Sequence, residues 1–308
     1  MFSANSLKKL IYGHLLLAIT LVVSNCSISD VGIPLDTVED TTELDFEYGE
    51  VIIQNEAPEV IIPVGISVES YNRWSSSSGF HSQSDLDNGN SLLATNLIFY
   101  NPKNNSTHLL LEQKAIISQF NYLQSSVLGA IVANKNRTES ATDQKIIYNI
   151  IDRDTDGDGK LTRGDAEIAY LSDLSGKNLV PITPRKTKVL NWEFVPQTKI
   201  IVLSLQLDSD QDQKFTREDR VAGYIYNLVS SKLQLITPDY TNLLSWKIDN
   251  KHKLIWLKLR KFTNQAHQFN GDQGEINWMT IQLENIAVTN EILSNQIKEK
   301  IKEINLKN

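Results

Sequence analysis

The amino-acid sequence predicts an all-β protein built from repeated antiparallel sheet units, followed by a C-terminal helix. From about residue 51 onward, short apolar runs alternate with turn residues, for example at 60–62, 97–100 and 145–148. Such evenly spaced short runs are typical of all-β domains. The second half of the chain also matches itself at a fixed shift, and only the last residues show a helical period.

Length, composition and charge narrow the class of protein. The 308 residues suffice for one large domain or two small ones, and 41% hydrophobic with 22% charged residues is ordinary for a globular chain. The formal net charge of -7 disfavours a nucleic-acid partner, because proteins that bind nucleic acid usually carry a basic face. An excess of carboxylates suits divalent cations better.

Residues 1–25 are predicted to be a signal peptide. Lys8 and Lys9 precede an apolar run that is too short for a membrane span. Cys26, the only cysteine, follows directly. The arrangement resembles a bacterial lipoprotein signal, which implies lipidation of Cys26, a membrane anchor, and a place in the cell envelope facing the periplasm or the exterior. Asn25 departs from the small residue usual before that cysteine, and the alternative is an ordinary secretory signal.

Residues 26–50 are interpreted as an acidic tether between the anchor and the folded body. The tether is assigned from its charge pattern. Its acidic residues are Asp30, Asp36, Glu39, Asp40, Glu43, Asp45 and Glu47.

A lone cysteine excludes an intrachain disulfide, so the stability of the fold must come from another source. Bound metal is one candidate.

A repeat-containing β domain is predicted over 51–290. A shift of 54 residues superposes two acidic loops, two Ile-Thr-Pro segments and two tryptophans without a gap. A single unit cannot bury its own apolar faces, so we expect the units, about four between 51 and 288, to stack. An aromatic residue recurs at one place in each unit, which favours core packing. The matched positions include Tyr170, Tyr224 and Trp278, as well as Trp192 and Trp246.

The C-terminal segment 291–308 is predicted to be a helix, near 291–306, whose apolar stripe packs on the sheets. Asn290 is its expected N-cap. The stripe consists of Ile292, Leu293, Ile297, Ile301 and Ile304, and charged residues lie mostly off it.

The repeat is similar to the blade of TolB-type β-propellers. The segment 172–179 has an Asp-x-x-Gly turn and is followed by Ile-Thr-Pro at 182–184, by Trp192 and by Lys199-Ile200-Ile201. The resemblance covers about 140–290. It implies a β-propeller-like stack, complete or incomplete, and protein partners. The Pro-Asp-Gly turn of that family is missing after Trp192, and about four units is few for a ring of 4–8 blades.

The segment 154–165, DTDGDGKLTRGD, matches a twelve-residue calcium loop of the EF-hand type. Such a loop needs side-chain oxygens at positions 1, 3 and 5, glycine at 6, a backbone carbonyl at 7 and a carboxylate at 12. Gly159 falls at position 6 and Leu161 is an apolar anchor at 8. A register beginning at Asp152 would place Arg163 where an anion is required. The predicted calcium ligands are Asp154, Asp156, Asp158, the carbonyl of Lys160, Thr162 and Asp165.

The segment 208–219 is predicted to be a second and weaker calcium loop. Gln213 replaces the glycine at position 6, and a non-glycine residue in a left-handed conformation costs about 1 kcal/mol. A third loop, starting at Phe262, lacks the acids and cannot bind calcium in this way. The predicted ligands of the second loop are Asp208, Asp210, Asp212, the carbonyl of Lys214, Thr216 and Asp219.

Aspartate at position 12 resembles the loops of dockerins and other extracellular bacterial calcium modules. That resemblance implies an affinity on the order of 10⁻⁴ to 10⁻³ M. The flanking segments 146–151 and 169–171 have the pattern of strands, whereas a calcium sensor would have helices. We therefore expect a structural role, in which the ion holds a strand-to-strand loop in one shape.

The sequence shows no catalytic constellation. No two histidines have metal-ligand spacing, no Gly-x-Ser-x-Gly is present, and the serine run at 75–78 is interpreted as a loop. The prediction is a non-enzymatic, calcium-binding envelope lipoprotein that acts as a binding or scaffold module, with another envelope protein as a candidate partner. One alternative is a propeller-type hydrolase or lyase with its site in the loops. The other is a dockerin-like pairing module, whose two loops would lie closer together, between helices.

Overall fold

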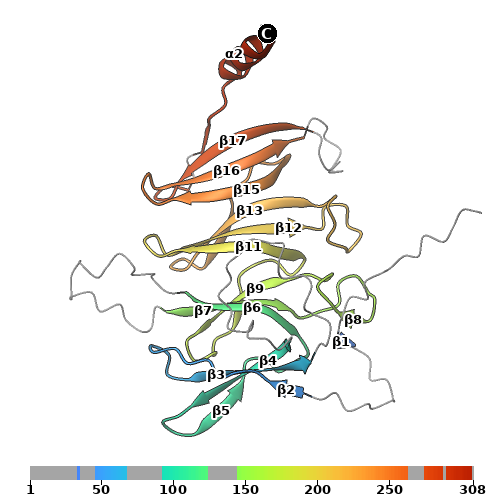
Figure 1. The fold of residues 1–308 in the computed structure, drawn as a ribbon, viewed down its shortest axis with the longest axis vertical. Helices are drawn as coiled ribbons and strands as arrows, with labels where there is room; N and C mark the ends of the chain where they lie inside the picture. The colour runs from blue at the N-terminus through green and yellow to red at the C-terminus, as the bar shows by residue number, and fades with distance from the viewer. Residues whose placement is uncertain are drawn as a thin grey trace, which may run out of the picture. The chain divides into compact units, whose positions relative to one another are not determined.

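The computed structural model describes residues 33–34, 46–67, 92–123, 144–262, 274–286 and 289–306. For residues 33–34 only the backbone is described. The predicted signal peptide, Cys26, the serine run at 75–78 and most of the third loop lie outside the described residues. Within the described part, the chain forms four antiparallel sheets of four strands each and a two-stranded sheet of β1 and β8, and in each four-stranded sheet the strands pair in chain order, with β8 left out of the second (Figure 1).

The strands have the following bounds. The first sheet contains β2 (Phe46–Tyr48), β3 (Val60–Ser67), β4 (Leu92–Asn101) and β5 (Ser106–Leu109). The second contains β6 (Ile116–Leu123), β7 (Lys145–Ile151), β9 (Ile168–Asp173) and β10 (Val180–Pro181). The third contains β11 (Thr187–Val195), β12 (Ile200–Leu207), β13 (Arg220–Asn227) and β14 (Lys232–Leu235). The fourth contains β15 (Thr241–Asp249), β16 (Leu254–Lys261), β17 (Glu275–Gln282) and β18 (Thr289–Glu291).

Apolar clusters join consecutive sheets. Ile61 and Phe99 of the first sheet share a cluster with Tyr148 of the second, and β-branched and leucine side chains join the second to the third and the third to the fourth. Side chains of a strand alternate between its two faces, so a strand that is apolar on both faces can serve two such clusters. Among the described residues, no cluster joins the first sheet to the fourth. The predicted stack of antiparallel sheet units is therefore confirmed, and it forms no closed sheet.

The 54-residue repeat is a repeat of strands and of their local contacts. Strands β15 and β16 start and end 54 residues after β11 and β12. Strands β11 and β15 carry a bulge at the same place. Before each of them, a threonine hydroxyl donates to a proline carbonyl, from Thr187 to Pro184 at 2.8 Å and from Thr241 to Pro238 at 2.7 Å. The Ile-Thr-Pro segments thus form the corner where the chain leaves one sheet and enters the next.

The C-terminal helix is present but differs from the prediction. Helix α2 covers Asn295–Leu306 and is capped by Ser294, whose Oγ accepts from the backbone N–H of Ile297 at 3.4 Å. The predicted apolar stripe is not packed, because Ile297, Ile301 and Ile304 are 46%, 49% and 60% exposed. A helical period shows that a helix is amphipathic, but it does not show that a surface exists to cover the apolar side.

The position of Trp278 also differs from the prediction. Tyr170 and Tyr224 pack in the clusters between sheets, as predicted. Trp278 lies on the opposite face of β17 from Met279, a member of the cluster between the third and fourth sheets. The cause is register, because Tyr224 is opposite Leu203 whereas Trp278 is opposite Lys258, one position beyond the equivalent partner. A shift of one residue turns a side chain to the other face.

The predicted tether contains two short strands. β2 pairs with β3, and β1 (Ile33–Pro34) pairs with β8 (Lys160–Leu161). For the rest of 26–50 the tether stays a prediction. No helix in the described part of the chain is long and apolar enough to cross a membrane.

Candidate metal centre

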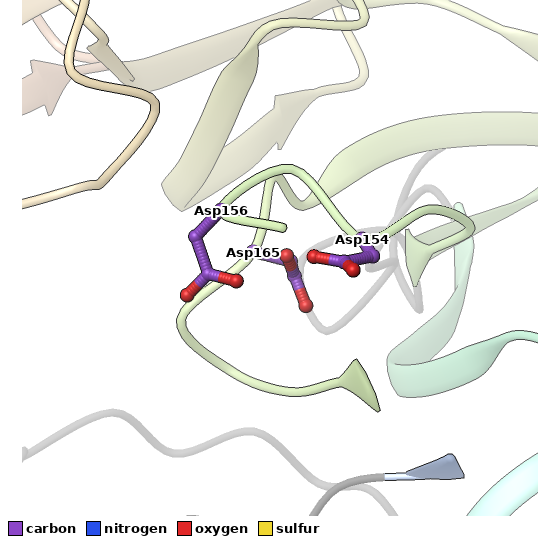
Figure 2. A group of neighbouring side chains, drawn as sticks. All are labelled: Asp154, Asp156 and Asp165. Atoms are coloured by element: carbon purple, nitrogen blue, oxygen red, sulfur yellow. The ribbon is translucent and has the colours of Figure 1, made fainter. Parts of the chain in front are cut away.

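Two groups of carboxylates lie in equivalent loops of the second and third sheets. The first loop connects β7 to β9, and the second connects β12 to β13. In the first, Asp154, Asp156 and Asp165 each offer an oxygen, and these oxygens lie within 4.8 Å of one another (Figure 2). In the second loop the same is true of Asp208, Asp210 and Asp212. Either group could hold a metal ion.

Backbone N–H groups shape the start of the first loop. The carboxylate of Asp154 accepts from the N–H of Gly157 at 2.6 Å and from that of Gly159 at 2.8 Å. Asp156 accepts from the N–H of Asp158 at 3.2 Å. Gly157 and Gly159 have φ values of 75° and 82°, which only glycine adopts readily. The backbone therefore turns twice within three residues, and these turns bring the aspartate side chains together.

Asp165 ties the two ends of the loop together. Its side chain is fully buried. One oxygen accepts from Thr155, from N–H at 2.6 Å and from Oγ1 at 3.1 Å, and the other accepts from the N–H of Thr162 at 2.8 Å. A carboxylate offers about four acceptor sites, so capacity for a cation remains.

The other predicted ligands of the first loop lie outside this group. Asp158 accepts from the N–H of Lys160 at 2.8 Å. Thr162 is 2% exposed, and its Oγ1 accepts from the N–H of Gly164 at 2.9 Å. The structure thus brings together three of the four carboxylates predicted as ligands, and the roles of Asp158, the Lys160 carbonyl and Thr162 stay predictions.

The second loop repeats this construction with one added feature. Asp219 is 2% exposed and accepts from the N–H groups of Ser209 and Thr216, both at 2.8 Å, as Asp165 does from the corresponding residues. Asp208 accepts from the N–H of Gln213 at 3.2 Å through one oxygen. Its other oxygen, Oδ1, is buried and has no hydrogen-bond partner. A buried acceptor without a partner is costly, and a cation would satisfy it.

The remaining predicted ligands of the second loop are more exposed. Asp210 belongs to the acidic group together with Asp212, whose Oδ1 accepts from the N–H of Lys214 at 2.8 Å. Thr216 Oγ1 accepts from the N–H of Glu218 at 3.1 Å. Asp219 is not part of the group of three.

The carboxylates repel one another. Burial raises the pKa of Asp156, and the charges of Asp165 and Asp158 raise it further. Burial likewise raises the pKa of Asp208, followed by the charges of its acidic neighbours. For Asp154, burial acts in the same direction, but hydrogen bonds from Gly159 and other residues outweigh it and lower the pKa. A bound cation would favour the charged forms at all three positions.

Two residues of the second loop hold a strained backbone. Gln213 has a φ of 67°, as its place at position 6 predicts, and Gln211 has a φ of 64°. They correspond to Gly159 and Gly157. Sequence reasoning missed Gln211, although the glycine 54 residues earlier could have indicated it.

The pairing of β1 with β8 was also missed. β8 consists of positions 7 and 8 of the first loop, and Leu161 is fully buried in a small cluster with Ile116 and Ile151. Two strand residues opposite it, 33–34, are too few for a periodicity to be visible.

The fourth sheet carries a shallow groove of about 740 Å³, lined in part by Trp256 and Trp278. Within it, Nδ1 of His252 lies 2.7 Å from Asp249 Oδ2, and the N–H of His252 donates to Oδ1 at 3.0 Å. Hydrogen bonding from His252 lowers the pKa of Asp249 to about 2. These hydrogen bonds link Asp249 and His252 to each other and close the β15–β16 turn. Neither of them involves a nucleophilic side chain.

Comparison with known proteins gives no family. No family model matches the chain, and no curated protein matches it in sequence. Among solved structures, it is similar to an oligogalacturonate lyase in complex with manganese, at 11% identity and a TM-score of 0.32, over 64% of this chain and 41% of that one. It is also similar to the tricorn protease, at 7% identity and a TM-score of 0.25, over 81% and 26%. The chain thus spans less than half the length of either, and such low scores establish neither a shared fold nor a shared activity.

Proposed function

We propose that both acidic loops bind calcium and that the ion has a structural role. The observation that carries the proposal is that a group of three carboxylates recurs in equivalent loops of two sheets, and that in each loop a buried aspartate, Asp165 or Asp219, joins the loop ends. The grouped donors are all carboxylate oxygens. Calcium takes six to eight oxygen ligands in flexible geometry, whereas zinc sites draw mainly on cysteine and histidine.

The place of the loops supports a brace and not a sensor. Each loop connects the second and third strands of its sheet, so an ion there would fix the loop between two strands already held by the core. Sensor EF-hands lie between helices that open. In this chain strands precede and follow both loops.

The wider function that we propose is that of a lipid-anchored binding or scaffold module of a bacterial envelope, without enzymatic activity. The basic and apolar residues before Cys26 support the anchor, and the resemblance to TolB-type blades supports a protein partner. The second candidate function is an enzyme, and its candidate active site would be the groove beside Asp249 and His252.

Calcium binding is tested by titration calorimetry and thermal unfolding of the full chain, with and without a chelator. At 10 mM calcium and a dissociation constant on the order of 10⁻⁴ to 10⁻³ M, one site adds about 1.4–2.7 kcal/mol. For a domain of this size that raises Tm by about 3–10 °C. The variant Asp154→Ala/Asp156→Ala should retain one site, as should Asp208→Ala/Asp210→Ala. Absence of heat and of any Tm shift in the wild type would refute calcium binding.

The binding role is tested by pull-down from detergent-solubilised envelope, with calcium or chelator, using wild type and Cys26→Ser. Recovery of one partner in calcium alone supports a calcium-stabilised module. Recovery of none, together with turnover of a substrate that His252→Ala abolishes, would favour the enzyme.

A further inference from the structure

The short strand β1 lies against the first acidic loop itself. The register pairs Ile33 with Leu161 and Pro34 with Lys160. Lys160 and Leu161 are positions 7 and 8 of the loop, the positions predicted to supply the carbonyl ligand and the apolar anchor. The equivalent pair in the second loop, Lys214 and Phe215, belongs to no strand of the described residues. Among the described residues, β1 therefore pairs with the first loop, and the second loop has no such strand partner.

The backbone N–H of Lys160 is used within its own loop and not in the pairing with β1. Its N–H donates to Asp158 at 2.8 Å, inside the loop. In an extended strand, the N–H and C=O of one residue point to the same side, and those of the next residue point to the other. The carbonyl of Lys160 therefore points away from β1, to the same side as its N–H, and stays available as the position 7 ligand of the proposed calcium loop. The N–H and C=O of Leu161 point toward Ile33.

Proline at residue 34 fits this arrangement. Proline has no N–H to donate, and the residue opposite it, Lys160, turns its own hydrogen-bonding groups away from β1. Within the described residues, the pairing thus rests on Ile33 and Leu161, which can exchange at most two hydrogen bonds. So small a contact is stable only if β8 is itself held still, and β8 is held by Leu161 in the core and by the shape of the loop.

We propose that calcium in the first loop fixes β8 and thereby holds the N-terminal segment at residues 33–34. The inference rests on the proposed calcium binding and adds a regulated contact to it. If Cys26 is the lipid anchor, Ile33 follows it by seven positions and Phe46 of β2 by twenty. A chain spans at most about 3.3–3.6 Å per residue, so the upper limit of the reach from Cys26 is roughly 25 Å to Ile33 and roughly 70 Å to Phe46. In this proposal calcium lowers the upper limit of the distance between the anchor and the first point of attachment to the sheets.

The test measures backbone hydrogen exchange by mass spectrometry at residues 31–36 and 159–163 of the full chain, with calcium and with chelator. The matched variants are Asp154→Ala/Asp156→Ala in the first loop and Asp208→Ala/Asp210→Ala in the second. We expect calcium to slow exchange at Ile33 about tenfold in the wild type and in the second-loop variant, and to have no effect in the first-loop variant.

A third variant, Ile33→Pro, removes the donor from β1 and leaves the loop intact. Linkage is reciprocal, so this variant should weaken calcium binding at the first loop by the same factor and leave the second unchanged. If calorimetry shows calcium in the first loop while exchange at Ile33 and affinity in Ile33→Pro are unchanged, the coupling is wrong and the calcium site stands. If calorimetry shows no binding, both proposals fail.

Discussion

Exchanging the residues at position 6 of the two loops tests whether backbone strain separates them. Gly159 and Gln213 occupy equivalent positions with φ values of 82° and 67°. A Cβ added at Gly159 would meet no atom within 4 Å. A Cβ therefore fits at this position, and the expected cost of a side chain there is that of the left-handed backbone. We expect opposite changes in stability from Gly159→Gln and Gln213→Gly.

The magnitude follows from two opposing contributions. A left-handed conformation costs an L-residue about 1–2 kcal/mol, and glycine loses about 0.5–1 kcal/mol more conformational entropy on folding. The net change is about 0.5–1 kcal/mol, a loss for Gly159→Gln and a gain for Gln213→Gly. In a domain of this size these values correspond to about 1–4 °C in Tm.

The assay is thermal unfolding at saturating calcium, with urea unfolding as a second probe. The double exchange is the internal control, because its effect should lie near zero if the loops are independent. Position 4 gives a replicate through Gly157→Gln and Gln211→Gly. Destabilisation by both single exchanges at position 6, or no effect from Gly159→Gln, would show that the strain argument does not describe these loops.

Three further predictions concern packing and charge. Gly176→Ala should destabilise the fold by about 1–3 kcal/mol in urea unfolding, because the new Cβ would lie 2.5 Å from the ring of Phe99; unchanged stability would show that the ring can move. Ile301→Glu on the exposed helix stripe should change Tm by less than about 2 °C, and a large loss would mean that the stripe is covered. The pKa values of Asp156 and Asp208 are raised in the folded state. These groups therefore stabilise the calcium-free fold at a pH below the ordinary carboxyl pKa near 4. That stabilisation is lost as the pH rises through the raised pKa values. Calcium needs both groups charged, so the Tm difference between calcium and chelator should shrink as pH falls from 7 toward 4, and a constant difference would contradict this.

The repeat is what made most of the fold predictable. A shift of 54 residues places strand on strand for β11 with β15 and for β12 with β16, and it aligns the acidic loops. Local chemistry also predicted the buried anchor at Leu161 and the left-handed backbone at Gln213. These features depend on residues close together in the chain, where spacing alone decides the outcome.

The errors arose where a distant partner decides the outcome. Trp278 is turned outward by a one-position difference in pairing between β16 and β17, which no spacing within β17 reveals. The stripe of α2 has the right period but no covering surface. For the site, spacing identified both loops, and the roles of Asp158, Lys160 and Thr162 as ligands stay predictions.

The two acidic loops share their acids but differ in backbone strain and in their contact with β1. Both keep the buried aspartate that joins the loop ends, Asp165 and Asp219, and both keep the acids at positions 1, 3 and 5. The first also has glycine at both left-handed positions and carries β1 on its outer edge. Of the two loops, the one with glycine at both left-handed positions is therefore also the one that pairs with β1 in the described part of the chain. For this reason the proposed coupling between calcium and the N-terminal segment is assigned to the first loop, and the second loop is assigned a bracing role alone.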